Sequence, residues 1–322
     1  MPNTFNIAID PGKGYCKVAY VQLNKENKPV GDIKTFSFPS RYEDFSPLRE
    51  NSSIDNIEID GLRVCVGNDV LENATSTENT KNEPVHKYCI YTALAKILGN
   101  GDVANVAIGC PIDIYKNVEA RKQYKDDMLP KGTLRFKFNG SDVHFEINKR
   151  IVCSEAISFI FGNDEYKTGE VGVIDLGYLN LNACQFDDGE YVNGSDVTLK
   201  YGAGVFERNV KQALLNKEEI APYISKKNIL KYISQGFMDC VDENVKEMSK
   251  PIITKAVNDI LSEIKETLTN GKWSNIKAIK VVFIGGTSVF LKDRLKDIFP
   301  NADIKADDTA RFANVKAFLT ML

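Results

Sequence analysis

Short apolar runs that end in turn residues form the clearest pattern along the chain. Residues 5–10 are largely apolar and lead into a turn at 11–14 that contains Pro and Gly. Residues 16–21 are predicted to return as the second strand of a hairpin. The runs at 103–110 and 171–175 have the same character. We therefore expect them to be buried strands of a sheet.

Helical periodicity follows these runs in both halves of the chain. Apolar residues three and four apart predict helices, and Asx-Gly pairs between apolar runs predict tight hairpins. The expected helices cover residues 85–98, 117–129, 151–161, 204–216, 226–234, 241–270 and 310–319, with another ending near 298. Further strands are expected at 32–38, 179–186 and 278–284. The expected hairpin turns lie at Asp60-Gly61, Asn139-Gly140 and Asp188-Gly189.

This order of strands and helices predicts an α/β protein with two lobes. A chain of 322 residues is long enough for two domains of ordinary size. Each half opens with a strand, a turn and a returning strand, which indicates a weak internal repeat. We expect a first domain at 1–165, with a small insertion at about 31–100, and a second domain at 166–309. The C-terminal helix, 310–322, is expected to pack back on the first domain.

Composition and charge are those of a globular protein, with 43% hydrophobic and 26% charged residues. The net charge of -3 provides no general attraction to a phosphate backbone, so any DNA contact is expected to be local or indirect. The seven cysteines include no Cys-x-x-Cys pair, which fits a reducing compartment. No signal sequence and no membrane-spanning run is evident. We expect a cytoplasmic protein without membrane contact.

The turn after the first strand has the residues of a phosphate-binding loop. In Asp10-Pro11-Gly12-Lys13-Gly14, the glycines allow backbone N–H groups to point at phosphate oxygens. Lys17 on the returning strand can add a positive charge, and Asp10 can hold a hydrated divalent cation. A plain β-turn would also use Pro and Gly here. This segment alone leaves both interpretations open.

A second turn of the same type follows the strand at 171–175. It reads Asp175-Leu176-Gly177-Tyr178-Leu179-Asn180. If Asp175 faces Asp10 from the opposite lobe, the two carboxylates can share one Mg²⁺ ion through water, with Asn180 near the terminal phosphate. A simple hairpin is again the alternative. Two such turns in one chain favour a nucleotide site more than either does alone.

A third element is a buried strand that leads into paired glycines before a helix. It reads Val281-Val282-Phe283-Ile284 followed by Gly285-Gly286-Thr287-Ser288. Paired glycines allow a flat ring or a sugar to lie against the backbone, and the start of a helix favours an anion. The alternative is an ordinary Gly-Gly turn, which is common after strands of α/β proteins.

These three elements, in this order and spacing, resemble the phosphate-1 turn, phosphate-2 turn and adenosine motif of the actin-like ATPase superfamily. The pattern Asp-x-Gly-x-Gly-x-Cys-Lys from Asp10 to Lys17 is similar to that of actin. The short chain and the small insertion, with Phe38-Pro39-Ser40 and Ile59-Asp60-Gly61, resemble the bacterial plasmid-segregation actins of the ParM type. The resemblance implies a duplicated, ribonuclease H-like α/β fold with the nucleotide in the cleft between the lobes.

The resemblance also implies roles for individual residues. Glu155 is similar to the acidic residue that positions the attacking water, and is expected at the start of an inter-lobe helix; a Glu favoured there by the helix dipole is the alternative. Glu207 and Lys211 are candidate contacts to ribose and base, although such a pair can be a plain surface ion pair. The implied catalytic residues are Glu155 and Asp175, and the implied metal ligands are Asp10 and Asp175. The implied nucleotide-binding residues are Asp10, Gly12, Lys13, Gly14, Tyr15, Lys17, Asp175, Gly177, Tyr178, Asn180, Gly204, Glu207, Lys211, Gly285, Gly286, Thr287 and Ser288.

The function implied by the resemblance is hydrolysis of ATP or GTP with Mg²⁺, coupled to dynamic filaments that move plasmid DNA in segregation. The partners would be further copies of the chain in a head-to-tail filament, a DNA-binding adaptor of the ParR type and, through it, a centromere-like plasmid site. Two alternatives in the same superfamily stay open. They are a small-molecule kinase and a scaffold or chaperone-like ATPase that does not polymerise.

Overall fold

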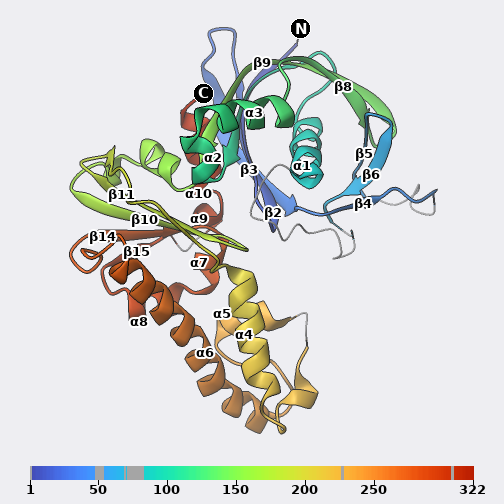
Figure 1. Cartoon of the computed structure of the whole chain (residues 1–322). Helices are drawn as coiled ribbons and strands as arrows, with labels where there is room; N and C mark the ends of the chain where they lie inside the picture. Colours follow the sequence, from blue (N-terminus) through green and yellow to red (C-terminus); the bar gives the residue numbers. More distant parts are fainter. Residues whose placement is uncertain (1, 48–53, 69, 71–82, 226–227, 306–307) are drawn as a thin grey trace. The chain divides into compact units, whose positions relative to one another are not determined.

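A computed structural model describes residues 2–47, 54–68, 70, 83–225, 228–305 and 308–322 (Figure 1). The chain forms two compact units: unit 1 comprises Met1–Asp164 with Phe312–Leu322, and unit 2 comprises Glu165–Arg311. Parts of the expected insertion, and the first two residues of the helix expected at 226–234, lie outside the described residues.

The sheet of unit 1 has the strand order β3-β2-β1-β7-β9-β8-β5-β6-β4. Strand β1 pairs antiparallel with β2 and parallel with β7, which in turn runs parallel to β9. The strands are β1 Thr4–Pro11, β2 Tyr15–Leu23, β3 Pro29–Pro39, β4 Tyr42–Asp44, β5 Asn56–Ile59, β6 Leu62–Val66, β7 Val103–Cys110, β8 Gly132–Phe138 and β9 Ser141–Ser154. The predicted hairpin at the N-terminus and the buried strand at 103–110 are both confirmed.

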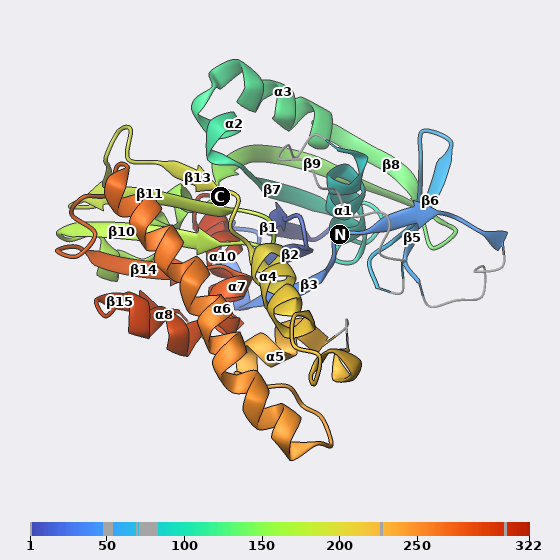
Figure 2. The same ribbon diagram turned by 60° about the horizontal axis from the view of Figure 1, so that its bottom comes forward.

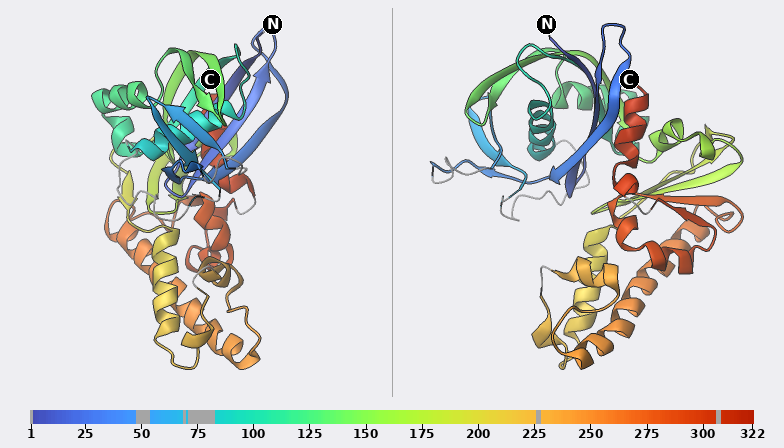
Figure 3. Two further views of the ribbon diagram at one scale, coloured as in Figure 1. Left: turned by 90° about the vertical axis from the view of Figure 1, so that its right-hand side faces the viewer. Right: turned by 180° about the vertical axis from the view of Figure 1, so that it is seen from behind.

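Helices cover both faces of this sheet. Figure 1 shows the strands curving round α1, whose apolar residues, such as Ile90 and Leu94, are fully buried against them. On the other face, α10 packs on small residues of the central strands, including Ala8, Ala19 and Ala107 (Figure 3). The helices are α1 Pro84–Ala95, α2 Ile112–Lys116, α3 Val118–Met128, the 3₁₀ helix η3 Ile157–Gly162 and α10 Ala313–Thr320.

The sheet of unit 2 has the order β12-β11-β10-β14-β15, with β13 paired to β11. The strands are β10 Glu170–Leu176, β11 Leu181–Asp187, β12 Glu190–Tyr191, β13 Val197–Leu199, β14 Lys280–Ile284 and β15 Ala302–Ile304. The helices are η4 Asp164–Tyr166, which crosses the unit boundary, α4 Ala203–Leu215, η5 Ala221–Tyr223, α5 Ile229–Gln235, α6 Glu243–Asn270, α7 Gly286–Phe290, α8 Lys292–Ile298 and α9 Asp308–Arg311. Figure 2 shows the long helix α6 running beside α4.

The two sheets repeat one arrangement of strands. In unit 1, β1 lies between its antiparallel hairpin partner β2 and the parallel strand β7. In unit 2, β10 lies between its antiparallel partner β11 and the parallel strand β14. This shared order confirms the predicted α/β class with a duplicated core.

The three predicted Asx-Gly hairpin turns are present. Both residues of each turn have positive φ, with values of 53° and 79° at Asp60-Gly61, 51° and 78° at Asn139-Gly140, and 46° and 81° at Asp188-Gly189. This is the backbone geometry that matches the twist of two-residue hairpins.

Three expected helices differ from those observed. Residues 151–154 continue β9, where Ser154 pairs with Cys110, and a short 3₁₀ helix follows after a turn. The helix expected to end near 298 is divided into α7 and α8 at Leu291, which has non-helical dihedrals. The C-terminal helix is likewise divided into α9 and α10 at Phe312.

Among the described residues, no helix has the length and apolar character needed to cross a membrane.

Candidate functional site

The first turn, Asp10–Lys17, joins β1 to β2 and carries a buried ion pair. Asp10 is the register partner of Lys17 across the hairpin. The Lys17 Nζ lies 3.2 Å from the Asp10 Oδ2, and the two side chains are 13% and 3% exposed. The hairpin therefore places a cation and a carboxylate, both predicted site residues, side by side at the end of β1.

Gly12 makes the close backbone contact that shapes this turn. Its N–H donates to the Asp10 carbonyl at 2.8 Å, and a Cβ at Gly12 would lie only 2.7 Å from the Tyr15 carbonyl oxygen. The carbonyl of Gly14 accepts from the N–H of Ser40, just after β3, at 3.0 Å. Side chains larger than Gly at position 12 would force the turn open.

The second turn, Asp175–Asn180, joins β10 to β11 in unit 2. The Gly177 N–H donates to the Asn180 carbonyl at 2.9 Å, which closes the turn. Asp175 is 5% exposed. Its register partner on β11 is Asn182 rather than a cation.

The start of α4 packs directly on the second turn. A Cβ at Gly202 would lie 2.3 Å from the Tyr178 carbonyl oxygen. The N–H groups of Ala203 and Gly204 donate to the carbonyls of Gly177 and Tyr178 at 3.1 and 3.0 Å. The helix thus begins by satisfying the carbonyl groups of the turn.

The loop after β14, Gly285–Ser288, approaches the same turn from another element. Gly285 has φ 91°, and a Cβ there would lie 2.3 Å from the Asp175 Oδ1. The Thr287 hydroxyl donates to the Gly177 carbonyl at 2.7 Å. The Ser288 hydroxyl is fully buried and donates to the Gly285 carbonyl at 2.7 Å.

Three segments that are far apart in sequence therefore meet at the Gly177 carbonyl. It accepts from Ala203 of α4 and from Thr287 of α7. Predicted site residues of unit 2 that the structure brings together here are Asp175, Gly177, Tyr178, Asn180, Gly204, Gly285 and Thr287.

Glu155 follows the last residue of β9 in unit 1 and is 9% exposed. Its N–H donates to the Cys110 carbonyl at 3.1 Å, beside the end of β7. The expectation that it begins a helix is wrong, because its own carbonyl accepts from the Ile157 N–H at 2.7 Å in a tight three-residue turn. Glu155 thus lies at the same end of the sheet as the first turn, since β1, β7 and β9 are parallel.

The remaining predicted residues lie in the first turn, on α4 and at the start of α7. Lys13 is half-buried in the first turn, where Tyr15 is 43% exposed. Glu207 and Lys211 are half-buried, one helical turn apart on α4. Gly286 begins α7, and nothing lies within 4 Å of the position of a Cβ there.

Sequence reasoning missed Gly202, which approaches the second turn as closely as Gly285 does. The sequence feature that could have identified Gly202 is the Gly-x-Gly spacing in Gly202-Ala203-Gly204, directly before a helical pattern. It also missed Asn314 of α10, whose Oδ1 accepts from the Ala156 N–H at 3.3 Å, next to Glu155. One polar residue among several in a mainly apolar helix gives little sequence signal of such a role.

Each unit contains a carboxylate of the kind that can hold Mg²⁺ beside a nucleotide. Glycines stand where a Cβ would overlap the turn backbone, as at Gly12 and Gly202, and the carboxylates of Asp10 and Asp175 offer the oxygen ligands that Mg²⁺ accepts. Within the part of the chain that the structure describes, no group of three or more His, Cys, Asp or Glu residues forms a ready metal centre.

Buried thiols near these sheets are unreactive at neutral pH. Burial raises the pKa of Cys153 to about 12. Burial, followed by the charges of Asp196 and Asp175, raises the pKa of Cys184 on β11 well above its ordinary value. Both thiols are therefore protonated and act as small apolar side chains.

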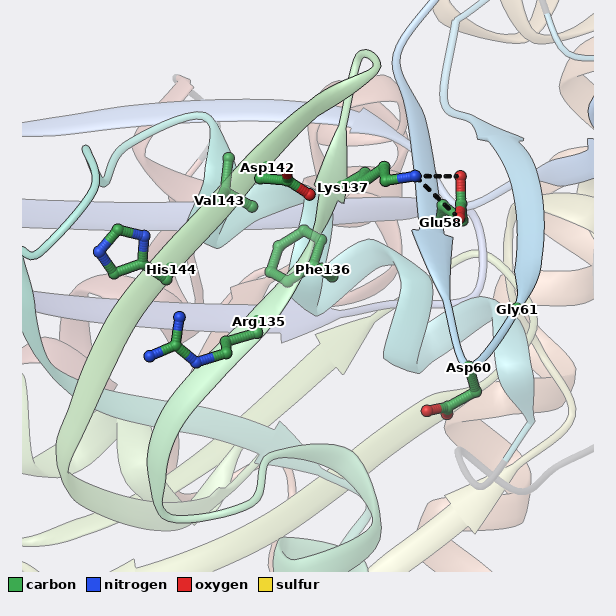
Figure 4. A pocket seen from close by; sticks show the side chains of 9 residues that line it. All are labelled: Glu58, Asp60, Gly61, Arg135, Phe136, Lys137, Asp142, Val143 and His144. Carbon is green, nitrogen blue, oxygen red and sulfur yellow. Dashed lines mark hydrogen bonds and ion pairs between the residues drawn. The ribbon is translucent and has the colours of Figure 1, made fainter.

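A separate pocket lies at the outer hairpins of unit 1 (Figure 4). Its volume is about 500 Å³, and it contains none of the predicted site residues. The Lys137 Nζ lies 3.3 Å from the Glu58 Oε1, which neutralises part of its lining. The lining residues are Glu58, Asp60, Gly61, Arg135, Phe136, Lys137, Asp142, Val143 and His144.

Comparison with known proteins found one matching family model, which covers the first half of the chain. Residues 8–157 match the family described as the N-terminal domain of actin-like proteins. No curated protein sequence matches the chain.

Solved structures extend this likeness to nearly the whole chain. Ta0583, an archaeal actin homolog, in complex with ADP matches with a TM-score of 0.70 and 19% identity, covering 98% of both chains. The apo psk41 ParM protein matches with a TM-score of 0.70 and 13% identity, covering 99% of this chain and 97% of that one. The AlfA filament bound to AMPPNP matches with a TM-score of 0.62 and 18% identity, covering 99% and 96%.

Residues 8–157 thus resemble the N-terminal domain of actin-like proteins, and the chain as a whole has the actin-like fold. The actin-like fold implied by the sequence resemblance is confirmed, and a ParM protein is among the structural neighbours.

Proposed function

We propose that this chain binds and hydrolyses a nucleoside triphosphate and polymerises with it into filaments. Support comes from the fold, which matches proteins solved as filaments or with adenine nucleotides. It also comes from the two Asp-x-Gly turns, one in each unit. ATP is the proposed nucleotide, because ADP and AMPPNP are the ligands named for those neighbours; GTP is the alternative.

The observation that carries the proposal is the meeting of three segments at the Gly177 carbonyl. Gly202 and Gly285 both stand where a Cβ would lie 2.3 Å from an atom of the second turn. Such close approach of three backbone segments is not required by a simple hairpin. It brings backbone groups of three segments close to Asp175, and backbone N–H groups are suited to bind phosphate and sugar groups.

The proposed residue roles follow the chemistry of the side chains. In unit 1, Lys17 and the glycines of the first turn bind phosphate oxygens, and Glu155 orients the attacking water. Asp10 and Asp175 would hold Mg²⁺, which when bound with the nucleotide neutralises charge on the phosphates.

In unit 2, Gly177, Tyr178 and Asn180 contribute backbone and polar contacts to the phosphates. Glu207 and Lys211 contact ribose and base. The loop Gly285–Ser288 supports the ring of the base.

The biological role that we propose is movement of plasmid DNA. A head-to-tail polymer would be the motile element, because heterologous contacts that do not close produce filaments. The net charge of -3 favours indirect contact with DNA, through an adaptor of the ParR type bound to a centromere-like site.

Light scattering, pelleting and phosphate release, measured together, test this function. Purified protein is given ATP or GTP, with Mg²⁺ or with EDTA. We expect Mg²⁺- and ATP-dependent scattering, a pelleted fraction and phosphate release. Asp175→Asn should abolish release, whereas Asp259→Asn, the same change at an exposed carboxylate on α6, should not.

Two other results would favour the alternatives within the superfamily. Nucleotide-dependent phosphate transfer to a sugar or acetate, by protein that stays monomeric, would replace the filament with a small-molecule kinase. Hydrolysis without scattering or pelleting at any protein concentration would favour a scaffold or chaperone-like ATPase.

A further inference from the structure

One residue after Glu155, the backbone adopts a conformation that alanine rarely accepts. Ala156 has φ 60° and ψ -53°, and the turn is closed by the hydrogen bond from the Ile157 N–H to the Glu155 carbonyl. This is a γ-turn of the rare form with positive φ at its central residue. Such strained residues persist only where the surrounding structure holds them in place, and they are concentrated at functional sites.

The strand side of this turn is anchored to the sheet. The Glu155 N–H donates to the Cys110 carbonyl at 3.1 Å. The Ser154 hydroxyl donates to the Glu155 carbonyl at 3.0 Å. These two bonds hold Glu155 from the side of the strand, but they do not reach Ala156, whose strained conformation is held from elsewhere.

The other side of the turn is held by α10. The Ala156 N–H donates to the Asn314 Oδ1 at 3.3 Å, and both residues are buried, at 0% and 4% exposure. Helix α10 cannot move freely away from this contact, because a Cβ at Gly162 would lie 3.0 Å from the Ala317 Cα. Close packing of η3 on α10 thus keeps the Asn314 amide within reach of Ala156.

We infer that Asn314 is a positioning residue for hydrolysis. Its amide oxygen holds the strained turn at Ala156 and thereby fixes the direction in which the Glu155 side chain leaves the backbone. This inference rests on the proposed function, in which Glu155 orients the attacking water. The proposed role of Asn314 is exerted through the turn at Ala156.

Three substitutions separate positioning from general packing. Asn314→Leu keeps the size of the side chain but removes the acceptor, whereas Asn314→Asp retains an acceptor oxygen. Ala156→Gly makes positive φ acceptable without external support. If the amide serves to hold Ala156 in its turn, Ala156→Gly should compensate for Asn314→Leu.

Hydrogen exchange provides a readout that does not depend on activity. In protein without nucleotide, N314L should increase exchange of the Ala156 amide, because that N–H loses its acceptor. The hairpin of β10 and β11 in unit 2 serves as the internal control and should be unchanged. Unchanged exchange at Ala156 in N314L would overturn the inference.

Kinetics test the consequence of the turn for Glu155. N314L should lower kcat for phosphate release by about 10- to 100-fold, as expected for a misplaced catalytic group. Affinity for the nucleotide should change by less than about twofold, because only the hydrolytic step is affected. N314D should keep most of the rate, and the double variant N314L/A156G should recover most of it. Loss of stability without loss of kcat, or no recovery in the double variant, would contradict the inference.

Glu155→Gln distinguishes failure of this inference from failure of the proposed function. If E155Q releases phosphate at the normal rate, the assigned role of Glu155 is wrong. If E155Q is slow and N314L is not, the function stands and Asn314 is not a positioning residue. The combined variant E155Q/N314L should be no slower than E155Q, since both changes affect the same step.

Should N314L fail to fold, Asn314→Ser, whose shorter side chain cannot reach Ala156, replaces it in each comparison.

Discussion

The two Asp-x-Gly turns, Asp10–Lys17 and Asp175–Asn180, occupy the same place in their sheets but are supported in different ways. In unit 1, Asp10 is paired with Lys17 of its own hairpin, and the close contact of Gly12 is with Tyr15 of the same turn. In unit 2, the second turn is held from outside, by Gly202 of the α4 start and by Gly285 and Thr287 after β14.

This difference shows that one sequence pattern can be stabilised locally or by tertiary contacts. The first turn contains most of its own support, so its geometry follows from a segment of eight residues, Asp10 to Lys17. The second turn depends on residues that are far away in sequence. We expect substitutions at distant positions to affect the second turn and local substitutions to affect the first.

Gly285→Ala should have the largest effect. The new Cβ would lie 2.3 Å from the Asp175 Oδ1, at a residue with φ 91°, so steric overlap and backbone strain add together. We expect a loss of about 4 kcal/mol in the free energy of unfolding. The single Trp273 is fully buried in unit 2, so its fluorescence during urea unfolding measures this loss.

Gly286→Ala is the matched control for this change. It adds the same atom one residue later, where nothing lies within 4 Å. Its unfolding midpoint should stay close to that of the wild type. Equal midpoints for G285A and G286A would mean that the second turn is not held by the β14 loop.

Strands and turns could be predicted from the sequence because their causes are local. The apolar run at 5–10, followed by Pro and Gly, sets the first hairpin, and its register then pairs Asp10 with Lys17. Asx-Gly pairs give the tight turns because those residues accept positive φ.

The parts that could not be predicted depend on contacts between distant segments. Residues 151–154 are mainly apolar, and a short apolar run is compatible with both a buried strand and a buried helix. These residues form a strand because they pair with β7. The overlap of Gly202 with Tyr178 and the bond from Ala156 to Asn314 follow from packing of elements, which short patterns do not encode.

Lys17→Met should have an intermediate effect, confined to unit 1. It leaves the Asp10 carboxylate buried without the cation that now lies 3.2 Å away. Removing one partner of a buried ion pair costs about 3 kcal/mol. Native-state hydrogen exchange of β1 and β2 should measure the loss, with little change in the transition reported by Trp273.

The double variant Asp10→Asn/Lys17→Met controls for the charge. It removes both partners, so it should be more stable than K17M alone, because no uncompensated charge is left in the hairpin. If the single and double variants are equally unstable, packing of the lysine side chain rather than its charge stabilises the first turn.

Thr287→Val should have the smallest of the three effects. Valine keeps the shape of the side chain but removes the hydroxyl that donates to the Gly177 carbonyl at 2.7 Å. That carbonyl still accepts from the Ala203 N–H at 3.1 Å, so it is not left unsatisfied, and we expect a loss of about 1 kcal/mol in the Trp273-reported transition. Thr287→Ser, which retains the donor, should lose less than T287V. A larger loss for the serine variant would show that the methyl group of Thr287, rather than its hydrogen bond, links α7 to the second turn.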